Sequence, residues 1–204
     1  MMRKAKSVIT YRGAVEGLQE EMYCDHLKKL INNNLNFSKR VNFLFKNSHG
    51  GSPTVIVKKA KQNSLNNDNN NVAIYDRDFK RDFIESINLA QEFNIMPAYS
   101  NQNFNYFLIL HKKFIYKQTT KSDNYEKELI KTYHLDKNSD IKSEESIIKI
   151  LEQINLEDVK LAMKNINRVN NETKNIQKQI APNIYEQPFL NILEFLEDIF
   201  EKVV

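Results

Sequence analysis

The chain has 204 residues, of which 41% are hydrophobic, 10% aromatic and 27% charged. This is the composition of a globular protein with a substantial core, and it excludes a disordered or collagen-like chain. The 30 Lys and Arg residues against 26 Asp and Glu residues leave a net charge of +4, which is too small an excess to specify a polyanionic partner. At roughly 150 residues per domain, one α/β domain with a helical extension is the expected organisation.

Two features of the sequence bear on the cellular compartment. The single cysteine, Cys24, cannot form an internal disulfide, as expected in a reducing cytoplasm. The basic N-terminus has too short an apolar stretch for a signal peptide, and no segment approaches the roughly 18 apolar residues of a membrane span. We therefore expect a cytoplasmic protein that does not bind a membrane.

The first third of the chain alternates strand and helix patterns. Ser7–Tyr11 is rich in β-branched residues and ends at Arg12-Gly13, which predicts a short buried strand. Apolar residues then recur at three- and four-residue steps over Glu16–Ile31, the period of an amphipathic helix. A second strand is predicted at Val41–Phe45, and the GGSP sequence at 50–53 predicts the start of another helix.

The middle third contains the most apolar segments. After a polar, Asn-rich stretch at 62–71, Val72–Tyr75 is a continuous apolar run typical of a fully buried central strand. A helix should follow, and then a strand at Ile95–Tyr99, which Pro97 assigns to a sheet edge or a strand start. The composition of Phe104–His111 suits either a buried helix or a buried strand.

Beyond residue 116 the pattern becomes that of charged amphipathic helices. Residues 1–116 are therefore predicted to form a mostly parallel sheet flanked by helices, and residues 117–204 an all-helical C-terminal region. Ser143, which is followed by two glutamates, suits the start of one of these helices. The last helix is acidic, so its apolar stripe should pack on the core, on a partner or in a homodimer rather than on a membrane: Phe189, Ile192, Leu193, Leu196 and Phe200.

Acidic residues that follow two of the predicted strands are the strongest functional signal. Glu16 and Glu20 follow the first strand, and Asp76 and Asp78 follow the third. The carboxyl ends of parallel strands meet at one edge of a sheet, which would bring these carboxylates together. A hard divalent cation such as Mg²⁺ or Mn²⁺ would neutralise them, activate water and stabilise the charge of a reacting phosphate. The pattern therefore predicts phosphodiester chemistry on a nucleic acid.

The same residues also have an ordinary structural interpretation. An aspartate after a strand is commonly a turn or helix-cap residue, so Asp76 or Asp78 could cap the helix expected near Phe79. Glu16 and Glu20 could be solvated acidic residues of a first helical turn. Such short motifs are frequent, and the pattern alone leaves both interpretations open.

Four blocks of sequence resemble the RloB-like family, bacterial proteins of the Toprim type found with phage defence. The distinctive block is YSNQNFNYFLILH at Tyr99–His111. The other three are VITYRGAVEGLQEEMYCDHL at Val8–Leu27, GGSPTVIVKKA at Gly50–Ala60 and VAIYDRDF at Val72–Phe79. Their order and spacing agree with the family over nearly the whole chain. The resemblance implies a Toprim-like α/β core, a metal-dependent nuclease site and a separate partner ATPase.

The resemblance also implies roles for the acidic residues. Asp76 and Asp78 correspond to the Toprim aspartate pair, and either Glu16 or Glu20 to the glutamate that follows the first strand. The family usually ends this strand in Glu-Gly, whereas this chain has Arg12-Gly13 and a Glu-Gly pair only at residues 16 and 17. Both glutamates therefore remain candidates.

Residues of the distinctive block are candidate contacts with the substrate. Asn105 stands where the family has glutamate, and an amide offers a carbonyl ligand but no general base. Ser100 and Asn101 would orient the site or form a turn. His111 would donate to phosphate or be a buried histidine satisfied by the backbone, and Lys112 would contact the phosphate backbone. The resemblance implies a metal-dependent endonuclease of anti-phage defence acting on RNA or DNA; the alternative is a non-catalytic Toprim-like binding or sensor subunit.

Overall fold

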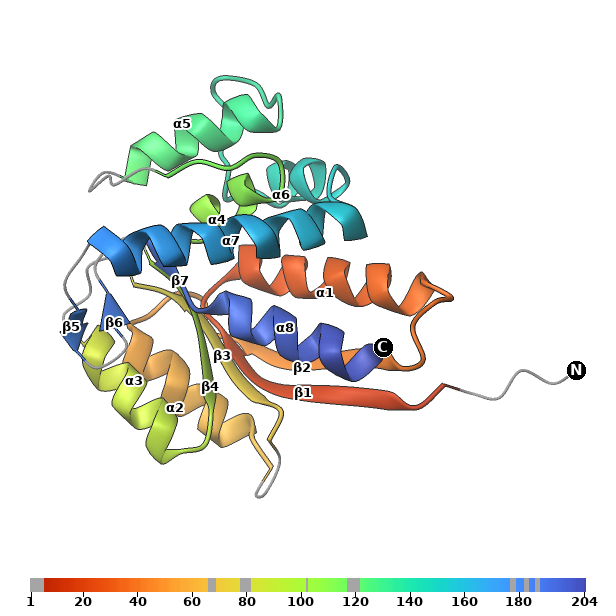
Figure 1. The fold of residues 1–204 in the computed structure, drawn as a ribbon, viewed down its shortest axis with the longest axis vertical. Coiled ribbons are helices and arrows are strands. Elements are labelled where there is room, and N and C mark those ends of the chain that lie inside the picture. The colour runs from red at the N-terminus through yellow and green to blue at the C-terminus, as the bar shows by residue number, and fades with distance from the viewer. Residues whose placement is uncertain are drawn as a thin grey trace, which may run out of the picture.

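The computed structural model describes residues 6–65, 69–77, 82–101, 103–116, 122–176, 179–181, 184–185 and 188–204. In this part of the chain a five-stranded sheet has the order β2-β1-β3-β4-β7 (Figure 1). Strands β1 to β4 are parallel, and β7 is antiparallel to β4. The predicted α/β fold with a mostly parallel sheet is confirmed. The strands are β1 (Val8–Val15), β2 (Arg40–Asn47), β3 (Asn71–Asp76), β4 (Met96–Asn101) and β7 (Phe189–Leu190).

Helices cover both faces of the sheet (Figure 1). Successive residues of a strand point to opposite faces, so Ala14 packs with α2 (Pro53–Asn63) and α3 (Phe83–Glu92), whereas Val15 packs with α1 (Leu18–Asn33) and α8 (Ile192–Val203). The remaining helices add to the core on the α1 side. They are α4 (Phe104–Leu110), α5 (Ser122–Thr132), α6 (Glu144–Leu151) and α7 (Leu156–Ile176).

Strand β1 is longer than its sequence pattern indicated. It continues past Tyr11 and through Arg12-Gly13 to Val15. Gly13 has a φ of 149°, and an added Cβ would stand 1.7 Å from the carbonyl oxygen of Val72. Glycine at this position therefore permits the close approach of β1 to β3 and does not end the strand.

The first helix consequently begins later than predicted. It starts at Leu18, with Gly17 as the N-cap, so Glu16 precedes the helix. The predicted starts of two other helices are confirmed. Pro53 occupies the first turn of α2 after Ser52, and the Ser143 side chain accepts a hydrogen bond from the Ser146 N–H of α6 at 3.3 Å.

Two ambiguous segments take a definite form in the structure. Pro97 is the second residue of β4, and β7 pairs with β4 only at Ser100 and Asn101. Because the β7 pairing does not reach Pro97, its missing N–H does not interrupt that ladder. The apolar block at Phe104–Leu110 is a helix, α4, and every residue in it is buried.

The C-terminal region is not all helical, and this part of the sequence-based expectation is wrong. The β7 strand joins the main sheet, and β5 (Gln179–Ala181) and β6 (Ile184–Tyr185) pair with each other. The Asn170 side chain accepts from the N–H of Leu190 and donates to its carbonyl oxygen, both at 2.9 Å, which ties β7 to α7. Strands of two or three residues are too short to produce a detectable period.

The apolar stripe of α8 is used within the chain itself. Ile192, Leu193 and Leu196 are buried in the same cluster as Tyr11 and Val15 of β1. None of the helices in the described ranges combines the length and apolar character that crossing a bilayer requires.

Candidate functional site

Strands β1, β3 and β4 run in the same direction and end at the same edge of the sheet. Glu16 directly follows β1, and Asp76 is the last residue of β3. Ser100 of β4 lies opposite Asp76 in the parallel register. The topology therefore brings together three residues that the sequence had singled out, at the edge where α/β folds commonly bind their ligands.

A direct contact joins Glu16 to Asp76. The backbone N–H of Asp76 donates to Glu16 Oε2 at 2.9 Å, and the N–H of Glu16 donates to the Ile74 carbonyl oxygen at 2.9 Å. The Glu16 side chain thus lies at the end of the neighbouring strand. Because β1 runs to Val15, Glu16-Gly17 is the Glu-Gly pair that follows this strand.

Glu20 is buried in the first turn of α1, with 5% of its surface exposed. Its Oε2 accepts the N–H of Gly17 at 3.0 Å. Burial, together with the nearby Glu16 carboxylate, raises the pKa of Glu20 to about 7, although the Lys142 ammonium acts in the opposite direction. The Glu16 carboxylate therefore opposes the ionisation of Glu20.

The donor chemistry of this edge fits a hard divalent cation. Carboxylate oxygens are the ligands that Mg²⁺ and Mn²⁺ prefer, and a cation would relieve the repulsion between Glu16 and Glu20. Asp78 lies outside the described residues. Among the residues that are described, no three His, Cys, Asp or Glu side chains form a group arranged to hold a metal ion.

Arg77 directly follows Asp76 at the end of β3, and the sequence pattern did not single it out. Its backbone N–H donates to the Ser100 carbonyl oxygen at 3.1 Å. Its guanidinium lies 5.3 Å from the ring centroid of Phe83 in α3, a cation–π contact that limits the freedom of the side chain. The position directly after Asp76 was the only signal that could have identified it.

Polar side chains at the end of β4 and the start of α4 lie next to these carboxylates. Ser100 and Asn101 are buried, with exposed fractions of 1% and 0%. The Asn103 side chain caps α4 by accepting the N–H of Tyr106 at 3.3 Å. Asn105 Oδ1 accepts from Gln19 Nε2 at 3.2 Å, which joins α4 to α1 next to Glu20. No sequence pattern pairs Gln19 with Asn105, so only the fold reveals this contact.

His111 lies in the interior, at the far end of α4. It is fully buried. Its Nε2 is 3.0 Å from the hydroxyl of Tyr23, and its Nδ1 is 3.1 Å from the carbonyl oxygen of Phe107. Burial lowers the pKa of His111 to about 4, so the ring is neutral at pH 7. This is the arrangement of a histidine satisfied within the core.

Lys112 is also held away from the carboxyl groups of Glu16, Glu20 and Asp76, which together form the acidic edge of the sheet. Its ammonium forms an ion pair with Asp158 of α7 at 2.9 Å and donates to the carbonyl oxygen of Gln153. Among the hydrogen bonds and ion pairs of the described residues, neither His111 nor Lys112 is joined to the acidic edge. The structure therefore brings Glu16, Glu20, Asp76, Ser100, Asn101 and Asn105 to one region and separates His111 and Lys112 from it.

Comparison with known proteins identifies the family. A family model described as RloB-like protein matches residues 14–199, a range that contains the acidic edge and the block at Tyr99–His111. No curated protein and no solved structure matched the chain. The family match covers most of the chain and agrees with the four blocks of sequence resemblance. The chain therefore belongs to the RloB-like protein family.

Proposed function

We propose that this protein is a metal-dependent endonuclease that hydrolyses phosphodiester bonds in RNA or DNA during anti-phage defence. The observation that carries the proposal is the 2.9 Å contact between Glu16 Oε2 and the backbone nitrogen of Asp76. It joins acidic residues of two adjacent parallel strands at the edge where ligands bind in α/β folds. The resemblance to Toprim-type proteins supports the same chemistry.

In this proposal Glu16, Asp76, Glu20 and Asp78 hold Mg²⁺ or Mn²⁺ through carboxylate oxygens. Such an ion, when bound, supplies an activated water and stabilises charge on the phosphate. The strands β1 and β3 hold Glu16 and Asp76 on rigid supports. The Glu20 carboxyl group, with its pKa raised to about 7, gains or loses a proton near neutral pH. Arg77 supplies a positive charge for the phosphate backbone.

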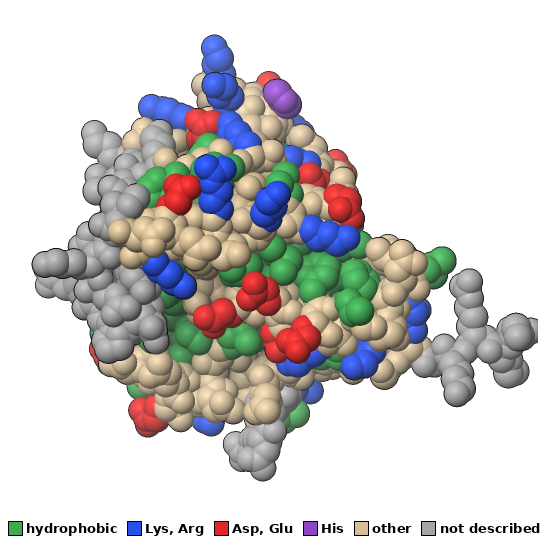
Figure 2. Space-filling view, in the orientation of Figure 1, with side chains coloured by type: hydrophobic (Ala, Val, Ile, Leu, Met, Phe, Trp, Pro, Cys, Tyr) green, Lys and Arg blue, Asp and Glu red, His purple; other side chains and the backbone are tan. Residues whose placement is uncertain are grey.

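The proposal includes the cellular compartment and the partner protein. The free, buried Cys24 is compatible with a reducing cytoplasm, and the family resemblance supports a separate ATPase that works alongside the nuclease. Figure 2 shows hydrophobic side chains gathered over α1 and α8, beside acidic side chains along α8. In our proposal the ATPase or a second copy of the chain packs on this surface. The exposed acidic residues of α8 are Glu194, Glu197 and Glu201.

One observation favours a second function, that of a non-catalytic Toprim-like binding or sensor subunit. Asn105 stands where the family has glutamate, and its side-chain oxygen already accepts a hydrogen bond from Gln19. A chain that had lost a general base at this position could keep the fold and a metal-binding edge while losing cleavage.

The test is incubation of the purified full-length chain with total RNA and with plasmid DNA, with and without Mg²⁺ or Mn²⁺. We expect cleavage that requires the metal ion and is lost in Asp76→Asn. The matched control is Asp25→Asn, which removes an exposed carboxylate from α1 and should cleave like the wild type. Metal binding without cleavage would support the second function, and cleavage that survives in Asp76→Asn would contradict the first.

A further inference from the structure

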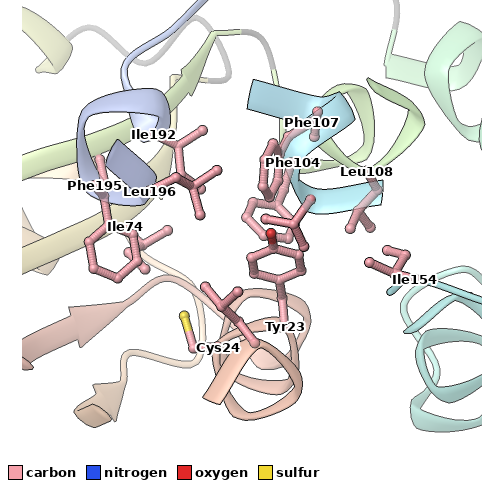
Figure 3. Packing of buried hydrophobic residues seen from close by; sticks show 14 of the residues in the cluster. Tyr23, Cys24, Ile74, Phe104, Phe107, Leu108, Ile154, Ile192, Phe195 and Leu196 are labelled. Carbon is pink, nitrogen blue, oxygen red and sulfur yellow. The ribbon is translucent and has the colours of Figure 1, made fainter. Parts of the chain in front are cut away.

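A series of contacts between α1 and α4 leads from the acidic edge to the buried His111. At the edge, Gln19 donates to Asn105 at 3.2 Å. Farther along α1, the ring of Tyr23 packs edge-to-face against Phe104 and Phe107, with centroid distances of 5.7 and 5.0 Å. Figure 3 shows Tyr23 pointing from α1 toward these two rings. The Tyr23 hydroxyl and the His111 ring complete the series.

The partners of His111 determine its tautomer. The Phe107 carbonyl oxygen can only accept, so Nδ1 of His111 carries the hydrogen in their 3.1 Å contact. In the neutral ring Nε2 then has a lone pair, and it accepts from the Tyr23 hydroxyl at 3.0 Å. Both ring nitrogens are therefore used within the core, and neither is available to a phosphate.

The position of Tyr23 is coupled to that of Glu20. The two side chains lie three residues apart on the buried face of α1, where residues at this spacing are neighbours. The start of the helix is also tied to the sheet, because only Glu16 and Gly17 separate β1 from α1. Whatever fixes Tyr23 against α4 therefore fixes the rotation and height of the helical turn that carries Glu20.

We propose that Tyr23 and His111 are positioning residues whose buried hydrogen bond holds the first turns of α1 against α4 and so places the Glu20 carboxyl group at the acidic edge. The inference rests on the proposed function and assigns to His111 a role that needs no contact with substrate. It differs from plain core packing in one respect: breaking the pair should disturb the acidic edge more than the loss of stability alone would explain.

Tyr133 provides a matched control for this distinction. Its hydroxyl is also buried and donates to the Leu108 carbonyl oxygen of α4 at 2.7 Å. Tyr133 follows α5, so its contact binds α4 to a different helix. Tyr23→Phe and Tyr133→Phe each remove one buried hydroxyl that bonds α4 or its C-cap, but only the first loosens α1.

The experiment compares both variants with the wild type as full-length chains, using two measurements. The first is amide hydrogen exchange at residues 21–24 without added metal, where the N–H groups of α1 begin to bond within the helix. There we expect Tyr23→Phe, and not Tyr133→Phe, to accelerate exchange about tenfold. The second is the Mg²⁺ dissociation constant, which should rise roughly tenfold in Tyr23→Phe alone, as for the loss of outer-shell support at metal sites. His111→Gln keeps an acceptor for Tyr23 and should lie nearer the wild type than His111→Leu.

Equal exchange and equal Mg²⁺ affinity in the two tyrosine variants would overturn the positioning role and leave the proposed function standing. Absence of Mg²⁺ binding by the wild type would contradict the proposed function instead. The exchange measurement would still decide the positioning role in that case, because it is made without metal.

Discussion

Glu20 and His111 are both buried ionisable side chains beside the α1–α4 contact, but their surroundings differ. His111 has a partner for each ring nitrogen, and its pKa falls to about 4 because burial disfavours the charged ring. Glu20 has a neighbouring acid in Glu16, and its pKa rises to about 7 mainly through burial. In the interior, Tyr23 and His111 thus form a neutral hydrogen-bonded pair. At the edge, the carboxyl groups of Glu16 and Glu20 lie close together, which lowers the stability of the fold when both are charged. Such a cost is typical of functional sites.

The largest expected effect comes from breaking the support of the acidic edge with Gly13→Ala. The added Cβ would meet the Val72 carbonyl oxygen at 1.7 Å, at a φ of 149°, so β1 and β3 must separate. We expect a loss of about 3 kcal/mol or more in the free energy of unfolding, measured by urea denaturation. Gly50→Ala is the control, because its Cβ meets nothing within 4 Å and only its φ of 88° is strained. Its loss should be about 1 kcal/mol, and equal losses would contradict the close approach.

Glu20→Gln should remove the loss of stability that ionisation of the buried Glu20 carboxyl group causes. The folded-state pKa of Glu20, about 7, lies above the ordinary glutamate value of 4.5. Its contribution is therefore fully present below pH 4.5 and is lost as pH rises through 7. Glutamine stays neutral and still accepts a hydrogen bond from the Gly17 N–H. The free energy of unfolding of the variant should therefore exceed that of the wild type by roughly 3 kcal/mol at pH 8 and match it near pH 4.5. Urea denaturation across this range without divalent ions measures the difference, and a constant difference would contradict the assignment.

His111 should affect the free energy of unfolding with a pH dependence opposite in sign to that of Glu20 and similar in size, and His111→Gln removes this contribution. The folded-state pKa of His111, about 4, lies below the ordinary histidine value of 6.5, so the unfolded chain takes up a proton first as pH falls. The wild type then loses roughly 3 kcal/mol from this group between pH 6.5 and 4.

As pH falls, the stability that the wild type loses through His111 is largely cancelled by the stability that it gains through Glu20. Stability should therefore rise with pH in Glu20→Gln and fall with pH in His111→Gln over the range from 4.5 to 6.5. Parallel pH profiles in the two variants would show that the two groups do not titrate as described.

The smallest effect is expected at the contact that links the two regions. Gln19→Ala removes the hydrogen bond to Asn105, and one such bond contributes about 1 kcal/mol to the free energy of unfolding. Lys28→Ala is the control on the same helix, because it removes only an exposed ion pair with Asp25 and should cost less than about 0.5 kcal/mol. Thermal or urea unfolding would compare them, and equal effects would mean that the Gln19 contact contributes little.

The two regions also differ in how far the sequence predicts them. The apolar run at Val72–Tyr75 identified a central strand, and strand direction alone then placed Asp76 at the carboxyl edge. To decide whether Glu16 or Glu20 directly follows the first strand, one must know the residue at which β1 ends. The Arg12-Gly13 pair obscured that end, because a glycine demanded by a neighbouring strand looks like a turn.

The α1–α4 interior was not predictable in the same way. Phe104–His111 was recognisably buried, but its composition did not distinguish helix from strand. The partner of His111 is Tyr23, which lies 88 residues away in sequence, and no local periodicity encodes such a contact. The short β7 strand escaped prediction for a similar reason, since its pairing depends on Asn170 of α7.

The most direct test of the account is a calorimetric titration of Mg²⁺ into the wild-type chain and into Glu16→Gln. The substitution keeps the size of the side chain and an acceptor for the Asp76 N–H, but it removes the charge. We expect saturable binding by the wild type and an affinity at least about 100-fold weaker in Glu16→Gln, because a lost ligand charge should exceed the loss of outer-shell support. Equal affinities in the two proteins would contradict a metal site at the end of β1 and β3.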